Sequence, residues 1–129
     1  MTVLHHVQVS CPAESEDAVR TFYGDLLGLA EVAKPAELAA RGGVWFRGPG
    51  YELHVGVEAG FTPARKAHPA FLVDDLDALA NRLGEGGVDL RWDSDFPGFR
   101  RFHITDPNGN RVEILGAAWP APVTTRVHL

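Results

Sequence analysis

The alternation of apolar and polar residues predicts the order strand, helix, hairpin, and this order occurs twice along the chain. Residues 6–11 alternate as in a half-buried strand, and apolar residues then recur at helical spacing over 18–27, where Gly28 ends the helix. The same succession returns as an apolar strand pattern over 68–73 and a helical pattern over 76–83. The chain is therefore predicted to consist of two similar halves.

Each predicted helix is followed by a predicted hairpin. The first hairpin spans residues 44–57 around the turn Gly48-Pro49-Gly50, and the second spans residues 101–115 around the turn Asp106-Pro107-Asn108-Gly109-Asn110. Between helix and hairpin of the first half, residues 34–43 fit either a short helix ended by two glycines or an irregular strand.

The length of the chain bounds the number of domains. At 129 residues it corresponds to one typical domain. Each half, at roughly 60 residues, is too small to bury a full core alone. We therefore expect a single α+β domain over residues 1–129, with one module over about 1–60 and a second over about 66–116. The tail, residues 117–129, is expected to pack in an extended form on the surface or on a partner subunit.

Composition and charge narrow the class of protein. With 45% hydrophobic and 22% charged residues, the chain is typical of a globular protein. The net charge of −5 argues against nucleic-acid or anionic-membrane partners. We find no apolar run long enough to span a membrane and no signal-peptide pattern, so we expect a cytoplasmic protein. The single cysteine, Cys11, excludes an internal disulfide and fits a small buried residue better than a nucleophile.

Strand alternation places the residues capable of metal binding on the faces turned away from the helices. His6 and His68 each open the first strand of their half, and His54 and Glu113 follow them at nearly equal intervals. Because all four lie on the face turned away from the helices, we expect them to face one cleft and to form a metal site there. Three imidazoles and one carboxylate suit Zn, Ni, Mn or Fe. The other side chains expected on these faces are Gln8, Phe46, Glu52, Arg101 and His103.

A simpler explanation of these residues stays open. A single histidine in a strand is more often structural or exposed than a ligand, and Glu113 also fits a solvated outward position. His103 lies directly across from Glu113 if the second turn pairs Thr105 with Arg111. It is then either a general base or a residue that orients Glu113.

Four segments together resemble the vicinal-oxygen-chelate superfamily, which includes glyoxalase I, the bleomycin and fosfomycin resistance proteins, methylmalonyl-CoA epimerase and extradiol dioxygenases. The resemblance covers about residues 3–116 and rests on His6-Val7-Gln8-Val9, Phe22-Tyr23-Gly24-Asp25-Leu26-Leu27-Gly28-Leu29, Phe71-Leu72-Val73-Asp74-Asp75-Leu76 and Asp106-Pro107-Asn108-Gly109-Asn110-Arg111-Val112-Glu113. It implies two βαβββ modules whose sheets curl around a cleft. It also implies a divalent metal held by His6, His54, His68 and Glu113, although glyoxalases often have glutamate or glutamine in place of His54.

The resemblance further implies a metal-dependent enzyme that moves a proton on a small oxygen-rich substrate, as a lyase or isomerase does. His103 is the first candidate for the base and Glu52 the second, and Gln8, Phe46 and Arg101 are expected to line the substrate pocket. Two alternatives stay open. One is an Fe(II)-dependent dioxygenase, against which a fourth protein ligand would count, and the other is a metal-free binding or resistance protein. Because family members of this length often pair, we expect a homodimer.

Overall fold

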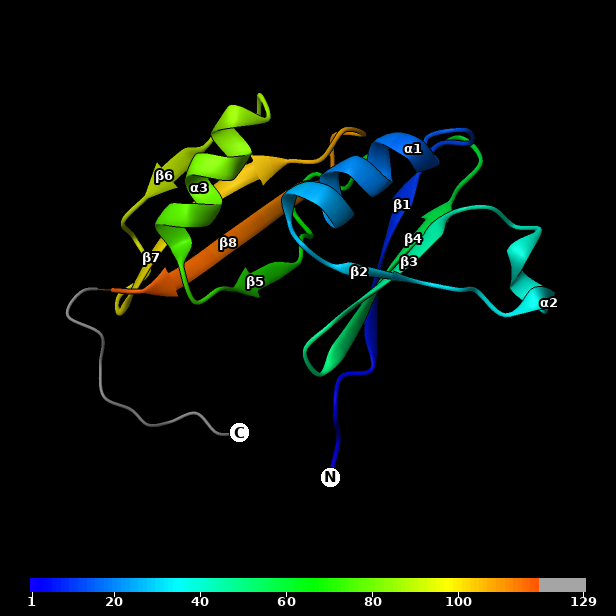
Figure 1. Cartoon of the computed structure of the whole chain (residues 1–129), viewed down its shortest axis with the longest axis horizontal. Coiled ribbons are helices and arrows are strands. Elements are labelled where there is room, and N and C mark those ends of the chain that lie inside the picture. The colour runs from blue at the N-terminus through cyan, green and yellow to red at the C-terminus, as the bar shows by residue number, and fades with distance from the viewer. Residues whose placement is uncertain (119–129) are drawn as a thin grey trace.

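Two four-stranded sheets, each covered by a helix on the same side, make up the architecture (Figure 1). The computed structural model describes residues 1–118. In chain order its elements are β1 (His6–Cys11), α1 (Glu16–Val19), η1 (Arg20–Leu26), β2 (Ala30–Val32), α2 (Ala36–Ala39), β3 (Val44–Gly48), β4 (Tyr51–Val57), β5 (Ala70–Leu72), α3 (Leu76–Glu85), β6 (Arg91–Asp93), β7 (Phe99–Thr105) and β8 (Arg111–Ala117). Segment η1 continues α1 with π-helical hydrogen bonding, so the two form one continuous helix.

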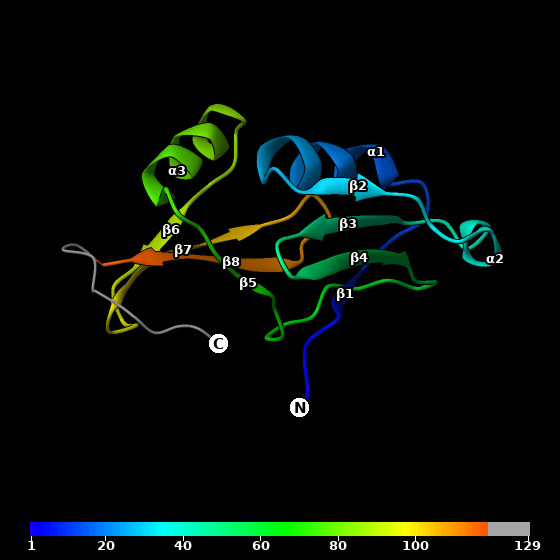
Figure 2. The same ribbon diagram turned by 60° about the horizontal axis from the view of Figure 1, so that its bottom comes forward.

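The two halves share one topology. The first sheet has the strand order β1-β4-β3-β2 and the second β5-β8-β7-β6. In each sheet the first strand of the half pairs in parallel with the last, and the other pairs are antiparallel. Figure 2 shows both long helices above the sheets, whose opposite faces carry no helix. The predicted α+β fold with two βαβββ halves and curled mixed sheets is confirmed, and the sheets are not closed into a barrel.

The core lies between the helices and the sheets. Gly28, with a φ of 84°, ends the first helix, and the Asp75 side chain caps α3 by accepting a hydrogen bond from the backbone N–H of Ala78. Residues from both halves belong to the same buried apolar cluster, so the two sheets share one core. Its fully buried members include Val19, Tyr23, Phe46, Leu53, Leu83, Phe102, Ile104 and Ile114.

The hairpin registers decide which side chains face away from the helices. In the second hairpin Thr105 pairs with Arg111 and His103 with Glu113, which confirms the predicted pairing. In the first hairpin Gly48 pairs with Tyr51, so that Phe46 lies opposite Leu53 and not on the face of His54.

The predicted place of Phe46 in the substrate pocket is therefore wrong. Its ring is fully buried on the helix side, with its centroid 5.9 Å from that of Tyr23. The reason is the length of the turn: only Pro49 and Gly50 separate the paired residues, and this fixes the register. Trp45 takes the position across from His54 instead.

Two further segments are settled by the structure. In the segment 34–43 the helical alternative is correct, since α2 occupies Ala36–Ala39, while the extra strand of this half, β2, precedes it. Strand β6 had no counterpart among the strands predicted from the pattern. The predicted extended tail lies almost entirely outside the described residues. Within residues 1–118, none of the helices combines the length and apolar character needed to cross a bilayer.

A buried carboxyl group joins the two halves. Asp106 opens the turn between β7 and β8 and accepts a 2.7 Å hydrogen bond from the hydroxyl of Tyr23 in η1. Burial raises the pKa of Tyr23 well above its usual value, so the hydroxyl keeps its proton. The backbone N–H groups of Asn108 and Asn110 donate to the other Asp106 oxygen, and the Asn110 amide donates both to Asp106 and to the carbonyl of Ser10 in β1. These bonds connect the turn to η1 and to β1 of the first half.

We predict that Tyr23→Phe lowers the free energy of unfolding by about 1–3 kcal/mol, because it deprives the buried Asp106 of one donor. Urea denaturation followed by circular dichroism measures the change. Tyr51→Phe is the matched control, since burial alone raises the pKa of Tyr51 and we find no hydrogen-bond partner for its hydroxyl within residues 1–118. Equal losses in the two variants would contradict the assigned role of the Tyr23–Asp106 bond.

Candidate metal centre

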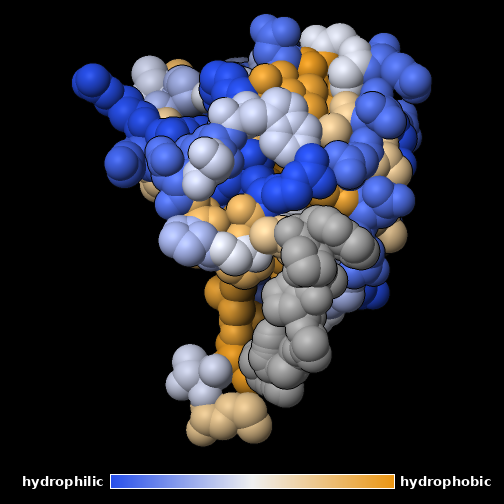
Figure 3. Space-filling view, turned by 90° about the vertical axis from the view of Figure 1, so that its left-hand side faces the viewer, coloured by the Kyte–Doolittle hydropathy of each residue, from blue (hydrophilic) through white to orange (hydrophobic). Residues whose placement is uncertain are grey.

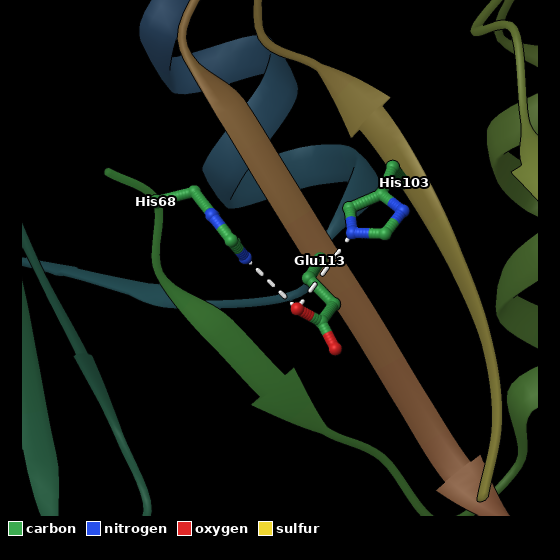
Figure 4. Close-up of side chains that lie close together, drawn as sticks. All are labelled: His68, His103 and Glu113. Atoms are coloured by element: carbon green, nitrogen blue, oxygen red, sulfur yellow. Dashed lines mark hydrogen bonds and ion pairs between the residues drawn. The ribbon is translucent and has the colours of Figure 1, made fainter. Parts of the chain in front are cut away.

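Two histidines and a glutamate converge on the helix-free face of the second sheet (Figure 4). The ligand atoms of His68, His103 and Glu113 all lie within 4.8 Å of one another. The strand pairing explains this approach: His103 lies across from Glu113 in the β7–β8 hairpin. His68 precedes β5, which is anchored beside β8 by the bond from the Glu113 N–H to the Pro69 carbonyl.

Both ring nitrogens of His68 face oxygen atoms. Nδ1 lies 2.9 Å from the carbonyl oxygen of Lys66, and Nε2 lies 2.9 Å from Oε1 of Glu113. A neutral imidazole has a single N–H, so donation to Lys66 leaves the lone pair of Nε2 facing the carboxylate. A cation at this point, either a proton or a metal ion, satisfies both atoms. Metal-bound histidines commonly donate their second N–H to a carbonyl in this way.

The surroundings of Glu113 stabilise its ionised form. Only 5% of the residue is exposed, and burial acts to raise the pKa of its carboxyl group. The close contacts with His68 and Arg101 outweigh burial and lower this pKa below its usual value. Oε2 accepts a 3.0 Å bond from Arg101, while Oε1 faces His68 and, at 3.7 Å, the Nε2 of His103. One carboxylate oxygen is therefore fixed and the other is directed at the two imidazoles.

Arg101 is engaged by protein carboxylates on both sides. Its Nε and Nη2 donate to Asp93 in β6 at 3.2 and 3.1 Å, and its Nη1 donates to Glu113. The ring of Phe96 covers the guanidinium at 5.3 Å. The sequence predicts that Arg101 lines the substrate pocket; in the structure its guanidinium bonds to Asp93 and Glu113 and so supports the Glu113 carboxylate.

His103 faces the centre in its neutral form. Burial lowers the pKa of its imidazole below the ordinary value of 6.5, the Glu113 carboxylate opposes this change, and the nearby Arg111 and Arg101 reinforce it. A neutral imidazole offers a lone pair either to a metal ion or to a proton. The position across from Glu113 suits both roles expected from the sequence.

The other two predicted ligands lie together but apart from this cluster. The rings of His6 and His54 stack at 4.1 Å, and Trp45 stacks on the other side of His54 at 3.8 Å. His54 Nε2 lies 2.9 Å from Glu52, and the bonds from His54 and Arg47 lower the pKa of the Glu52 carboxyl group. Among the described residues, the only group that brings three ligand atoms within 4.8 Å is His68, His103 and Glu113. Within a single chain, the four predicted ligands thus form two separate pairs, His6 with His54 and His68 with Glu113.

Two hollows meet at His68. The first, of about 340 Å³, lies between β1 and the connection that leads to β5, and Gln8 and Arg111 line it together with His68. Gln8 therefore lies where a substrate pocket was expected. The second, of about 660 Å³, is a mostly apolar groove that Glu52 shares with His68; its apolar lining includes Val3, Leu4, Pro49, Tyr51, Phe71 and Leu72. Phe46 lines neither hollow.

Sequence reasoning missed several groups that shape these sites. Trp45 could have been found, because a two-residue loop at Pro49 and Gly50 already implies its place across from His54. Asp93 lies in the three-residue strand β6, which is too short to produce a recognisable alternation. No feature of the sequence pointed to the carbonyl of Lys66 as the partner of His68.

Comparisons with known proteins agree with this architecture. Residues 4–114 match the family model described as Glyoxalase/Bleomycin resistance protein/Dioxygenase superfamily. The structure of a glyoxalase family protein from Bacillus anthracis is 41% identical, with a TM-score of 0.88 over 92% of this chain and 97% of that one. A glyoxalase/dioxygenase from Nostoc punctiforme is 28% identical, with a TM-score of 0.72 over 88% and 90%.

The lactoylglutathione lyase from Agrobacterium tumefaciens is a more distant structure, 21% identical, with a TM-score of 0.69 over 90% of this chain and 94% of that one. At this identity the likeness shows the shared fold alone. A comparison with curated proteins finds no match.

In metal-free protein, we predict that the His103 imidazole titrates below 6.5, and that Glu113→Gln lowers its midpoint further, because a carboxylate that favours the imidazolium is lost. The pH dependence of the His103 ring resonances in NMR spectra measures both midpoints. Glu52→Gln, which removes the carboxylate bonded to His54, is the control and should leave the His103 midpoint unchanged. A rise in the Glu113→Gln variant would contradict the assigned electrostatics.

Proposed function

The chain belongs to the glyoxalase/bleomycin resistance protein/dioxygenase superfamily, and from this we propose that it is a metal-dependent enzyme acting on a small, oxygen-rich substrate. The proposed reaction is a proton transfer of the lyase or isomerase type. The observation that supports it best is the geometry of His68, whose Nδ1 faces a carbonyl while its Nε2 faces the carboxylate of Glu113. Metal-binding histidines commonly have this arrangement, which supports the proposal.

The donor set fits a divalent metal ion. Neutral imidazoles and a carboxylate suit Zn, Ni, Mn or Fe, and burial of Glu113 and His103 limits competition from water. When bound, such an ion acts as a Lewis acid that polarises a substrate oxygen. We propose His68 and Glu113 as ligands and His103 as the group that accepts and returns the substrate proton, since burial keeps its imidazole neutral.

Neighbouring residues orient these groups. The Lys66 carbonyl selects the tautomer of His68 that leaves Nε2 free, and Arg101 holds Oε2 of Glu113 so that Oε1 faces the imidazoles. Asp93 in turn fixes the guanidinium of Arg101 with two hydrogen bonds. Support of this kind commonly changes metal affinity by about 10- to 100-fold.

We propose further that the remaining two ligands, His6 and His54, come from a second copy of the chain in a homodimer. Both pairs lie on helix-free faces, and within one chain they remain separate. The apolar groove beside His68 is bordered by unusually exposed side chains: Val3, Leu4 and Leu72 are 70%, 62% and 70% exposed. The N-terminal segment projects as an apolar column in Figure 3. Burial of these side chains against a second copy would favour association.

The three-residue cluster taken alone supports a second candidate, an Fe(II)-dependent dioxygenase. Two histidines and one carboxylate are the usual ligands of such iron centres. A fourth protein ligand would count against a dioxygenase. Among residues 1–118, the His68–His103–Glu113 cluster holds three ligands and no fourth one. The two candidates differ in whether His6 and His54 are needed for metal binding.

We predict that the protein, purified without a histidine tag, binds about one divalent ion per chain, and that His68→Ala or Glu113→Gln lowers its affinity for Zn²⁺ by more than about 100-fold. Metal content measured by mass spectrometry and competition with a chromogenic chelator check this. Arg101→Met is expected to lower affinity by about 10- to 100-fold. Arg100→Met is the matched control, because the neighbouring Arg100 forms a similar fork with Asp77 on the helix side. Unchanged affinity in Glu113→Gln would overturn the proposed function.

We predict that the double variant His6→Ala/His54→Ala also loses the metal, and that a heterodimer of this variant with His68→Ala/Glu113→Ala regains one ion per dimer. The heterodimer contains one complete set of four ligands and one set with none. Co-expression with two different affinity tags, tandem purification and metal analysis measure the recovery. Full metal binding by the His6→Ala/His54→Ala variant would refute the shared site and favour the iron-dependent candidate.

A further inference from the structure

One of the residues that line the hollow of about 340 Å³ beside His68 is an arginine without a partner among residues 1–118. Arg111 lines this hollow, and we find no ion pair or hydrogen bond for its guanidinium within residues 1–118. The other two arginines of the β7–β8 hairpin differ from it: Arg100 is bonded to Asp77, and Arg101 to Asp93 and Glu113. Of these three, Arg111 alone retains its full hydrogen-bonding capacity for a ligand.

The position of Arg111 relates it directly to the metal centre. It precedes Glu113 by two residues on β8, so both side chains leave the same face of the strand, about 7 Å apart along it. His68 opens onto the same hollow as Arg111. A molecule in this hollow can therefore contact both Arg111 and His68, one of the candidate metal ligands.

Gln8 in β1 adds a second polar residue to the lining. We find no hydrogen-bond partner for its side-chain amide within residues 1–118. It lies over Gly56, where an added Cβ would come within 2.9 Å of the Gln8 Nε2, so the absence of a side chain at Gly56 makes room for the amide. Thr62 adds a hydroxyl to the lining. These donors and the guanidinium suit an oxygen-rich anion.

We propose that this hollow binds the anionic end of the substrate: a carboxylate or phosphoryl group held by Arg111, with Gln8 donating to another of its oxygens. The inference rests on the proposed function, because it assigns the substrate class of that site. The volume lies at the small end of ligand-binding cavities, which suits a compact molecule whose anionic group is a few bonds from the oxygens that would reach the metal. Glu58 also lines the hollow, and because its carboxylate repels anions we expect the bound group to carry a single negative charge.

The test is titration of metal-free protein with L-lactate and with inorganic phosphate, followed by calorimetry and by the NMR signals of Gln8 and His68. Arg111→Met is expected to weaken binding by at least about tenfold, since a charge-assisted bidentate pair is lost. Arg111→Lys should give an intermediate affinity, because the ammonium keeps the charge without the planar fork. Arg100→Met should bind as the unaltered protein does.

Each outcome bears on the inference. Stronger Arg111-dependent binding of lactate supports a carboxylate substrate, and stronger binding of phosphate supports a phosphoryl one. Undetectable binding of both anions, binding in Arg111→Met within twofold of the unaltered protein, or an equal loss in Arg100→Met overturns it. Because the titration uses metal-free protein, anion binding that depends on Arg111 stands even if metal binding fails, whereas normal metal binding without such anion binding refutes this inference alone.

Discussion

The buried carboxyl group of Asp106 is the interaction on which the arrangement of the two halves depends. A buried polar group of this kind destabilises the fold unless donors surround it, and here they come from distant parts of the chain. Tyr23 donates from the helix of the first half, while Asn110 bonds both to Asp106 and to the Ser10 carbonyl of β1. The halves cannot shift against each other without breaking these bonds. The same contacts fix β1 opposite β8, and hence the walls of the hollow that His68 and Gln8 line.

Alternate residues of strand β8 pack in the core and line the candidate site. Val112 and Ile114 are fully buried against the helices, while Arg111 and Glu113 face the other way. A slip of one residue in the β7–β8 register would exchange these faces, so that charged groups would enter the core and apolar ones the candidate metal centre. The turn that begins at Asp106 prevents this slip. Stability and the proposed chemistry therefore depend on the same few hydrogen bonds.

Local pattern predicted what depends on one strand or one hairpin. The alternation of apolar residues and the length of the second turn placed His103 across from Glu113, and the repeat pointed to His68 beside them. Phe46 was misplaced because alternation alone does not fix a register, whereas the two-residue loop does. Contacts between elements lay beyond the pattern: the partner of Arg101 comes from the very short strand β6, and the separation of the His6–His54 pair depends on how whole sheets pack.

The stack of Trp45 on His54 makes the fluorescence of this tryptophan sensitive to the state of the imidazole. The indole and imidazole rings are 3.8 Å apart and parallel within 1°, and His6 covers the opposite side of the imidazole. At this distance a change in the charge of the imidazole, whether from a proton or from a coordinated ion, alters the emission of the indole. Trp92 packs against Phe102 in the other sheet, far along the chain from these histidines. The part of the intrinsic fluorescence that comes from Trp45 is therefore expected to change when the His6–His54 pair binds a proton or an ion, without any added label.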